Sequence, residues 1–519
     1  MNYFTTQMCR IIFRKYLLLV FIVFLSLPNV AWASSGAVDY PYWTVVPFVG
    51  ILLSIAICPL INAHWWEKNI GKVALFWSLA FTIPAAVFWG LGNAWYSLLH
   101  IMLLDYVPFL TLVAGLFVVA GGINIGGTLP NTPLANSVML AIGASLASIV
   151  GTTGATMLLI RPIISANKDR HMKTHTIIFL IFLVSNIGGV LTPVGDPPLF
   201  LGFLHGVPFF WTLGLFADWL FNVAFLLVLY FAIDGYFFRK HKLDMEAMNV
   251  NSQKYKELSF SEQLKEMLSF EHNDEEHGDQ KIKASIKIIG LQNLLFLAGI
   301  LAAVIFSGVC AQHPVFFDKI HNLPRGLVVM THHDHELLVP YINMIRDGFI
   351  ILMAICSLKF TSKEIREANS FTWGPVEEVG ILFAGIFATI IPALAILGAH
   401  GKELGLTEPW QFFWATGLLS SFLDNAPTYL VFTSLASQLG STVGVVTDMG
   451  IIDENLLKAI SAGAVFMGAN TYIGNAPNFM TKAIAEENGV PMPSFFGYML
   501  WSGLILIPLF ILNTLLFFR

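Results

Sequence analysis

The sequence contains 519 residues, of which 56% are hydrophobic and only 12% are charged, and its formal net charge is −5. Soluble domains carry about 25% charged residues, so the composition excludes a soluble globular protein and predicts an all-α polytopic membrane protein. The four cysteines are scattered, and no Cys or His spacing suits a disulfide framework or a transition-metal site. We therefore expect no cofactor, a lipid bilayer as the surroundings, and no nucleic-acid partner.

The N-terminal residues 1–33 have the layout of a secretory signal peptide. Basic residues within positions 10–15 precede an apolar core at 16–27, and Ala31-Trp32-Ala33 forms an A-x-A cleavage site. The alternative is an uncleaved first helix. In either case, the chain after Ala33 starts on the outer side of the membrane.

Residues 34–242 are predicted to form a first structural repeat. It has three spans, a re-entrant hairpin, a broken span and a final span, at 44–61, 73–90, 107–126, 136–160, 176–205 and 215–238. Lys68 and Lys72 place the connection at 62–72 in the cytoplasm, whereas 91–105 has no Lys or Arg and is expected outside. Basic residues also follow the hairpin at 161–173, so both of its ends are expected on the cytoplasmic side.

The second half, residues 286–519, repeats this order. Its corresponding segments lie at 287–309, 341–358, 374–398, 409–438, 457–486 and 497–518. A polar stretch at 243–285 joins the halves, and we expect a cytoplasmic linker without chemistry of its own. Because each half crosses the membrane an odd number of times, the two halves are predicted to form an inverted repeat.

The first broken span contains the stretch Ser185 to Gly202, with three prolines and one acid, Asp196. Proline removes a helical hydrogen bond, and broken backbone at membrane depth persists only where protein buries it or a watery cavity meets it. A carboxylate near the bilayer centre costs about 2.5–3.5 kcal/mol on insertion scales, so Asp196 is a candidate functional residue. The alternative is a Pro/Gly loop that emerges into water.

A second stretch, Gly468 to Ala485, has the same layout, with Asn475-Ala476-Pro477 in the place of Asp196-Pro197-Pro198. An interrupted apolar segment precedes each stretch, GTTGAT at 151–156 and FLDNAPT at 422–428. Interrupted segments at corresponding positions of two halves indicate the substrate site of a transporter.

The breaks and hairpin tips carry oxygen ligands suited to a weakly held cation such as Na⁺, beside free helix ends. The candidate cation- and proton-binding residues are Asp196, Asp424, Thr152, Thr153, Thr156, Ser185, Asn186, Thr192, Asn425, Thr428, Asn470, Thr471, Asn475 and Asn478. Each polar one could instead be a helix cap or a turn residue. A carboxylate that holds either H⁺ or Na⁺, never both, is the minimal device for antiport, and Asp196 and Asp424 supply one in each half.

Other polar residues are secondary. Glu377, Glu378 and Asp347 are possible proton-handling residues, with an interfacial position in water as the alternative. Three further acids near span ends are expected at the interface: Asp105, Asp218 and Asp234. The outer loop at 310–338 contains His-His-Asp-His at 332–335, which we interpret as a chance cluster rather than a metal site.

Four segments resemble signature segments of the ion transporter superfamily, and within it of the NhaD-type sodium/proton antiporters. They are SNIGGVLTPVGDPPLFLGFLHGVPFFW (185–211), LFAGIF (382–387), FLDNAPTYLVF (422–432) and GANTYIGNAPNFM (468–480). The resemblance implies a scaffold domain, a transport domain that moves like an elevator, and a homodimer in the bacterial inner membrane. Related members carry citrate, dicarboxylates or arsenite.

The sequence departs from the dicarboxylate branch, which uses Ser-Asn-Thr triplets at both tips. Here the triplets are Ser185-Asn186-Ile187 and Asp424-Asn425-Ala426, which favours a cation exchanged through an acid. The leading hypothesis is therefore a secondary Na⁺(Li⁺)/H⁺ antiporter. The alternative is a Na⁺- or H⁺-coupled citrate or dicarboxylate carrier, although the nearest basic residues, Arg161 and Lys482, are predicted closer to the cytoplasmic face.

Two other classes fit less well. A channel or receptor does not need two matched hairpins, which suggest alternating access. An ATP-driven pump needs a G-x-x-x-x-G-K-[ST] phosphate loop, and the sequence has none. No enzyme activity is predicted.

Overall fold

The computed structural model describes residues 40–128, 130–248, 258–269, 271–274, 280–283, 285–321, 323–332 and 335–519. Residues 1–33, the predicted signal peptide, lie outside this part of the chain. The described residues are mostly helical, and they include ten helices long and apolar enough to cross a membrane. The protein is a multi-pass membrane protein, as its composition predicts.

The chain begins with the short helix η1 (Tyr42–Val45) and the long helix α2 (Val46–Trp89), which contains two spans. Asn62, with φ −156° and ψ 91°, kinks α2 three residues after Pro59. The connection predicted at 62–72 is therefore helical apart from this kink, because no proline follows in that segment.

The next three elements form one apolar rod from Leu91 to Ala120. They are α3 (Leu91–Ile101), the π-helical turn η2 (Met102–Tyr106) and α4 (Val107–Ala120). The segment at 91–105, which we expect outside the membrane, is helical and continues into α4, because it is apolar and free of proline. Helix α2 and this rod are separated by one residue, Gly90, whose φ of 90° suits glycine.

Both predicted hairpins are helical hairpins in the structure. In the first, α5 (Pro133–Val150) and α6 (Thr152–Ala166) meet at Gly151, whose φ of 81° favours glycine. In the second, α16 (Pro409–Phe422) and α17 (Asn425–Ser437) are joined by Leu423 and Asp424.

Both predicted broken spans are broken. The elements of the first are α7 (Thr174–Leu183), η3 (Ile187–Leu191) and α8 (Pro197–Leu204), and those of the second are α18 (Glu454–Met467), η7 (Gly468–Asn470) and α19 (Ala476–Glu487). Proline in the first turn of α8 and of α19 costs little, since the N–H groups there have no helical partner. After the first break come η4 (Phe209–Leu215) and α9 (Phe216–Met248), and after the second comes α20 (Phe495–Phe517).

The remaining helices are α11 (Phe260–Met267), α12 (Gln292–Val309), α13 (Tyr341–Phe360), α14 (Lys363–Ala368), α15 (Gly374–His400) and η6 (Gly401–Leu404). The strands form antiparallel pairs: β1 (Asn124–Thr128) with β4 (Ser285–Ile289), β2 (Glu271–Asp274) with β3 (Gln280–Lys283), β5 (Phe317–Asp318) with β6 (Leu323–Pro324), β7 (Gly326–His332) with β8 (His335–Pro340), and β9 (Val445–Thr447) with β10 (Gly450–Ile452). The linker predicted at 243–285 thus contains a helix and strands, and the outer loop forms the β7–β8 hairpin.

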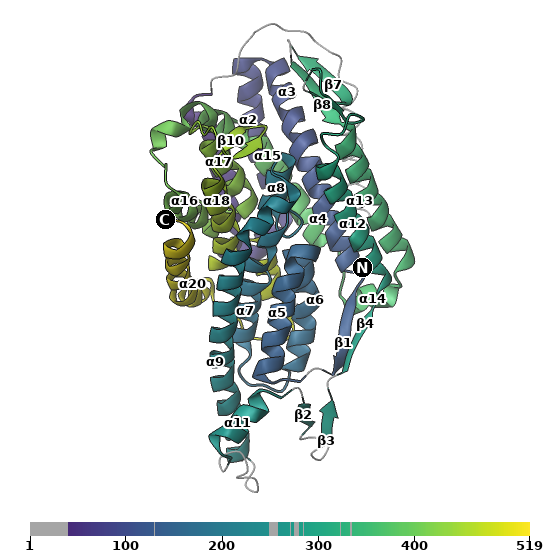
Figure 1. Ribbon diagram of the computed structural model, residues 1–519, viewed down its shortest axis with the longest axis vertical. Coiled ribbons are helices and arrows are strands. Elements are labelled where there is room, and N and C mark those ends of the chain that lie inside the picture. The colour runs from purple at the N-terminus through teal and green to yellow at the C-terminus, as the bar shows by residue number, and fades with distance from the viewer. Residues whose placement is uncertain are drawn as a thin grey trace.

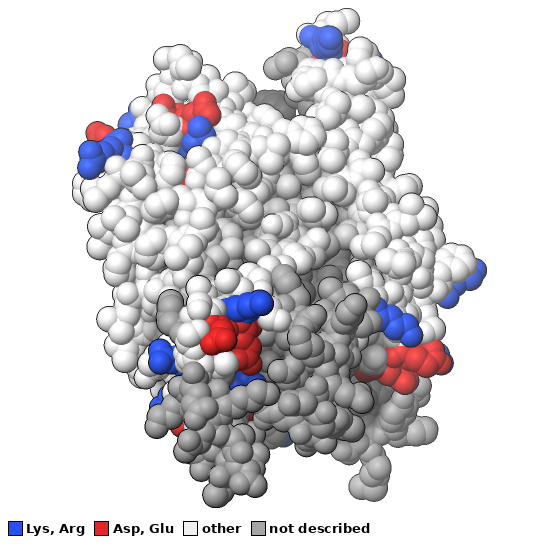
Figure 2. Space-filling view, turned by 60° about the horizontal axis from the view of Figure 1, so that its bottom comes forward, with Lys and Arg blue, Asp and Glu red and all other residues white. Residues whose placement is uncertain are grey.

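The helices run roughly along the long axis of the molecule, and the β7–β8 hairpin lies beside the end of α3 (Figure 1). At the centre, every residue from His175 to Leu183 of α7 is buried, and α18 packs along α16. On the face shown in Figure 2, the charged side chains gather in a few places toward the ends of the molecule, with a broad uncharged surface between them. We call α2, α3, α4, α12, α13 and α15 the framework helices, and α5–α8 with α16–α19 the hairpin unit.

Candidate functional site

The two helix breaks meet at a pair of matched residues. Asp196 precedes α8 with φ −144° and ψ 144°, and Asn475 precedes α19 with φ −153° and ψ 140°. The Asn475 Nδ2 donates a hydrogen bond of 3.2 Å to Asp196 Oδ1. The pairing of the two stretches that the sequence suggests therefore corresponds to two equivalent backbone positions in contact.

Each break is attached to its neighbouring hairpin in the same way. Thr192 Oγ1 donates to the Ser148 carbonyl of α5, and Thr471 Oγ1 donates at 2.5 Å to the Ser421 carbonyl of α16. The two serine hydroxyls donate in return to backbone carbonyls of the breaks, at 2.6 and 3.1 Å. The hairpins and the breaks are thus connected into one hydrogen-bonded unit.

Asp196 is buried, with 1% of its surface exposed, and the two hairpin tips both contact it. Its Oδ1 accepts from Thr152 Oγ1 at 2.9 Å, at the start of α6, and its Oδ2 accepts from Asn425 Nδ2 at 2.5 Å, at the start of α17. With Asn475, its side-chain partners come from three separate elements, and all are neutral. The chain folds so that one acid lies where two tips and two breaks meet.

Further amides and hydroxyls extend this cluster. Asn475 Nδ2 also lies 3.1 Å from the Ser185 carbonyl and 3.2 Å from Asn186 Oδ1. Asn186 Nδ2 donates to Asn478 Oδ1 at 2.7 Å, and the hydroxyls of Thr156 and Ser185 are 2.8 Å apart. The residues around Asp196 therefore present oxygen atoms and neutral donors.

Two amide oxygens of the residues at the hairpin tips and breaks are buried without a hydrogen-bond partner among the described residues. They are Oδ1 of Asn425, whose Nδ2 contacts Asp196, and Oδ1 of Asn470 beside Ser421. A buried acceptor without a partner is costly, by about 1–3 kcal/mol, so such oxygens are usually met by water or an ion. A carboxylate, hydroxyls and unpaired amide oxygens are a ligand set for a hard cation.

Paired glycines allow the backbone to fold this tightly at the breaks. A Cβ on Gly195 would lie 2.1 Å from the Gly189 carbonyl oxygen, and one on Gly474 would lie 2.5 Å from that of Gly468. Real Cβ atoms do not approach backbone this closely, so these positions accept only glycine without a shift of the chain.

The structure places the other candidates around or away from this cluster. Asp424 is half-buried at the tip of the second hairpin, where its side chain accepts from the Ala426 N–H at 3.2 Å and caps α17. Thr428 donates to the Asp424 carbonyl at 3.0 Å. Thr153 lies in the first turn of α6. Among the described residues, no hydrogen bond joins Asp424 to Asp196.

The three possible proton-handling acids lie apart from the cluster. Glu377 and Glu378 are exposed in the first turn of α15. Asp347 on α13 accepts from Arg346 Nε at 2.8 Å, and Arg346 is almost completely buried. Asp347 is therefore neutralised by its neighbour.

The three acids near span ends, which we expect at the membrane interface, are buried within the protein. Asp105 and Asp218 are each 5% exposed, and Asp234 is fully buried. Asp234 is compensated by an ion pair with Arg170 and by His175 Nε2 at 2.7 Å. The sequence could not show this, since these partners lie 59 and 64 residues away along the chain.

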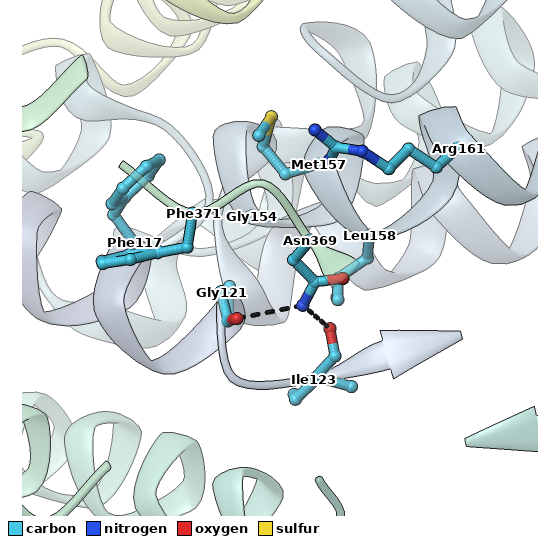
Figure 3. Close-up of a pocket in the computed structure, with 10 residues that line it drawn as sticks. Phe117, Gly121, Ile123, Gly154, Met157, Leu158, Arg161, Asn369 and Phe371 are labelled. Carbon is cyan, nitrogen blue, oxygen red and sulfur yellow. Dashed lines mark hydrogen bonds between the residues drawn. The ribbon is translucent and has the colours of Figure 1, made fainter. Parts of the chain in front are cut away.

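The two basic residues that the sequence places nearest the breaks, Lys482 and Arg161, form no hydrogen bond or ion pair with Asp196 among the described residues. Lys482 pairs with Glu486 at 2.7 Å. Arg161 lines a cavity of about 20 Å³ between α6 and the end of α4 (Figure 3). Asn369 lines the same cavity, and its side chain donates to the carbonyls of Gly121 and Ile123 at 2.9 and 2.7 Å. That volume suits one water molecule rather than a carboxylate.

A larger cavity of about 740 Å³ lies between α2, α15 and the second hairpin. It reaches from Tyr42 and His400 to Leu423 and Thr428 at the hairpin tip. The described residues contain no group of three or more His, Cys, Asp or Glu able to hold a metal. Positions 333 and 334 of the His-His-Asp-His stretch lie outside the described residues.

Convergence of two helical hairpins and two helix breaks on one buried acid points to a membrane transporter rather than an enzyme. The profile of a protein family described as "Putative citrate transport" matches residues 37–518. The chain belongs to that family, which is consistent with the ion transporter superfamily. A search of curated proteins found no match.

Proposed function

We propose that the protein is a secondary transporter that exchanges Na⁺ or Li⁺ for H⁺, with Asp196 as the coupling carboxylate. The observation that carries this proposal is the set of partners of Asp196. The acid is buried, and its side-chain hydrogen bonds come from Thr152, Asn425 and Asn475, which are neutral. Either a proton or a cation can therefore balance the charge of the Asp196 carboxylate.

The amide partners support exchange between two occupants. Asn425 donates one hydrogen bond to Asp196 and holds an unpaired oxygen in the same buried space. When Na⁺ binds, that oxygen and the carboxylate are available as ligands; when a proton binds, the amide N–H groups and hydroxyls remain within reach of the carboxyl oxygens. Only one occupant is accommodated at a time, which is the requirement for antiport.

The arrangement of the two halves supports a mechanism of alternating access. Each half has its hairpin, break and last helix in the same order, and the residues of the two breaks match. We propose that the halves are inverted repeats and that the hairpin unit moves against the framework helices, within a homodimer in a bacterial inner membrane. The candidate ligands Thr152, Thr153, Ser185, Asn186, Thr192, Asn425, Thr428, Asn470 and Asn475, with Asp424, belong to the moving unit.

A second candidate function is coupled transport of citrate or a dicarboxylate, which the family's description favours. Without a basic side chain at Asp196, an organic anion would have to be held by amides, helix N-termini and a co-bound cation. Both functions share the cation site and differ in the second substrate.

Proteoliposomes with a preset pH gradient and the purified protein distinguish the two functions. Addition of Na⁺ or Li⁺, but not K⁺ or citrate, is expected to dissipate the gradient, and labelled citrate is expected to stay outside. Citrate uptake that depends on Na⁺, with no cation-driven change of the gradient, would contradict the exchange and support the carrier.

A further inference from the structure

A charged cluster joins the hairpin unit to the framework helices at the end of α8 away from Asp196. His205, the residue after α8, lies between two acids. Its Nδ1 is 2.9 Å from Asp448 Oδ1, and its Nε2 forms an ion pair of 3.1 Å with Asp105 Oδ1. The sequence predicts this end of α8 on the outer side.

The two acids belong to different parts of the molecule. Asp448 lies in the β9–β10 turn between α17 and α18, and its N–H also donates to the His205 carbonyl at 3.0 Å. Asp105 lies in η2, within the framework rod α3–η2–α4. Asp448 is thus fixed to His205 by side chain and backbone, whereas Asp105 reaches it through the ion pair alone.

The arrangement requires the charged form of the imidazole. Carboxylates only accept hydrogen bonds, and only imidazolium carries an N–H on both ring nitrogens. The His205 side chain is 16% exposed and that of Asp105 is 7% exposed, so their attraction is only partly screened by water. A neutral imidazole would leave one of the two carboxylates facing a lone pair and would lose the charge that attracts both. A single proton therefore sets the strength of the contact with Asp105.

The other elements against α8 supply few charges. Helix α17, which packs most extensively on α8, has no acidic or basic residue, and in α18 Glu454 and Lys458 pair with each other at 2.9 Å. His100 on α3 interacts electrostatically with all three members of the cluster. From α13, the Arg346 guanidinium lies 5.6 Å from the Phe200 ring of α8. Gly308 of α12 packs against Phe203. Gly308 has no titratable group, and Arg346 stays protonated at neutral pH. His205 and His100 are therefore the groups that can change protonation there.

We propose that His205 is a proton-binding site, separate from the transport site, that latches α8 to the α3–α4 rod from the outer side. The protonated form holds the latch closed, and loss of the proton removes the charge that attracts Asp105, which weakens the contact and lets the hairpin unit move. The inference rests on the proposed movement of that unit, but not on which ion or anion is carried.

Cross-linking two cysteine pairs tests which contact has to break. In a background without the native cysteines, Asp105→Cys with His205→Cys, joined by a short thiol-specific linker, is expected to stop transport until the linker is reduced. His205→Cys with Asp448→Cys is the matched control, since both residues lie in the hairpin unit, and its cross-linking is expected to leave transport unchanged. Full transport by the cross-linked Asp105–His205 pair would overturn the latch.

The role of the proton is tested without transport. Leu204→Cys is labelled by an impermeant maleimide, and its rate is divided by that of Val443→Cys, which is 81% exposed and corrects for thiol ionisation. Burial lowers the pKa of His205, but the two carboxylates beside it outweigh burial and raise that pKa above the ordinary value of histidine. We therefore expect the ratio to rise about tenfold as the pH outside the vesicle increases above about 6.5. With His205→Gln or Asp105→Asn added, it should be high and independent of pH.

An unchanged pH dependence in His205→Gln would refute the proton site even if the cross-linking result holds. Because labelling reports the opening at α8 and not the cargo, a protein that carries citrate instead of Na⁺ would still show the dependence. Failure of the proposed function and failure of the latch therefore give different results.

Discussion

At the scale of single residues, Asp196 differs from Asp234 and Asp347 in the charge of its partners. Asp234 is paired with Arg170, and Asp347 is paired with Arg346. Protonation of either acid would leave an uncompensated buried cation, which is costly. The partners of Asp196 are neutral, so gaining or losing a proton leaves no charged partner behind.

Replacement of the second candidate acid is expected to have a smaller effect. Asp424 caps α17, and Asn caps a helix about as well as Asp, so exchange by Asp424→Asn should stay within about fivefold of the original. The measurement is the rate of Na⁺-driven pH-gradient dissipation in proteoliposomes. If Asp424→Asn is as inactive as Asp196→Asn while folding normally, the two acids share the coupling role.

The Asp234 cluster is expected to be structural. Asp234→Asn leaves Arg170 buried without its counter-ion, and breaking a buried pair costs about 3–5 kcal/mol. Thermal unfolding in detergent should therefore occur at a clearly lower temperature. Glu486→Gln, which breaks the exposed pair with Lys482, is the control and should change stability by about 1 kcal/mol or less; equal effects of the two changes would contradict this view.

At the scale of elements, the sequence predicts what local chemistry determines. The hairpins predicted at 136–160 and 409–438 and the two broken spans are present, because glycine, proline and polar residues interrupt apolar runs there. The 91–105 segment was placed outside the membrane on charge alone, and its apolar residues form helical structure that continues into α4.

The candidate site was predictable in its members but not in its geometry. Asp196 and Asn475 follow from the layout of the two breaks. That Asn425 contacts Asp196 across 229 residues, and that Asp105 meets His205, depends on how distant helices pack, which no local pattern encodes.

Substitution at a break should show how much the tight backbone matters. Gly195→Ala forces a Cβ against the Gly189 carbonyl, and such overpacking costs about 1–3 kcal/mol. We expect a lower unfolding temperature and slower transport, because the shift displaces Asp196. Gly503→Ala, where a Cβ in α20 would meet nothing within 4 Å, is the control; normal transport by Gly195→Ala would show that the break tolerates rearrangement.

At the scale of the whole molecule, the inverted repeat requires opposite sides for two exposed residues. Ile320, which is 89% exposed near the β5–β6 hairpin, is expected outside. Asp244, exposed near the end of α9, is expected in the cytoplasm. An impermeant thiol reagent applied to cells should label Ile320→Cys alone, and everted vesicles should show the reverse. Labelling of both positions from one side would contradict the inverted orientation of the halves.

The most direct measurement is the exchange activity of Asp196→Asn in proteoliposomes, beside the unchanged protein at equal reconstitution. Asparagine keeps the shape of the side chain and costs less at membrane depth than a carboxylate, so the variant should fold and insert normally. The account predicts that Na⁺ and Li⁺ no longer dissipate a pH gradient in either direction at any pH. Full Na⁺-driven proton movement by Asp196→Asn would contradict it.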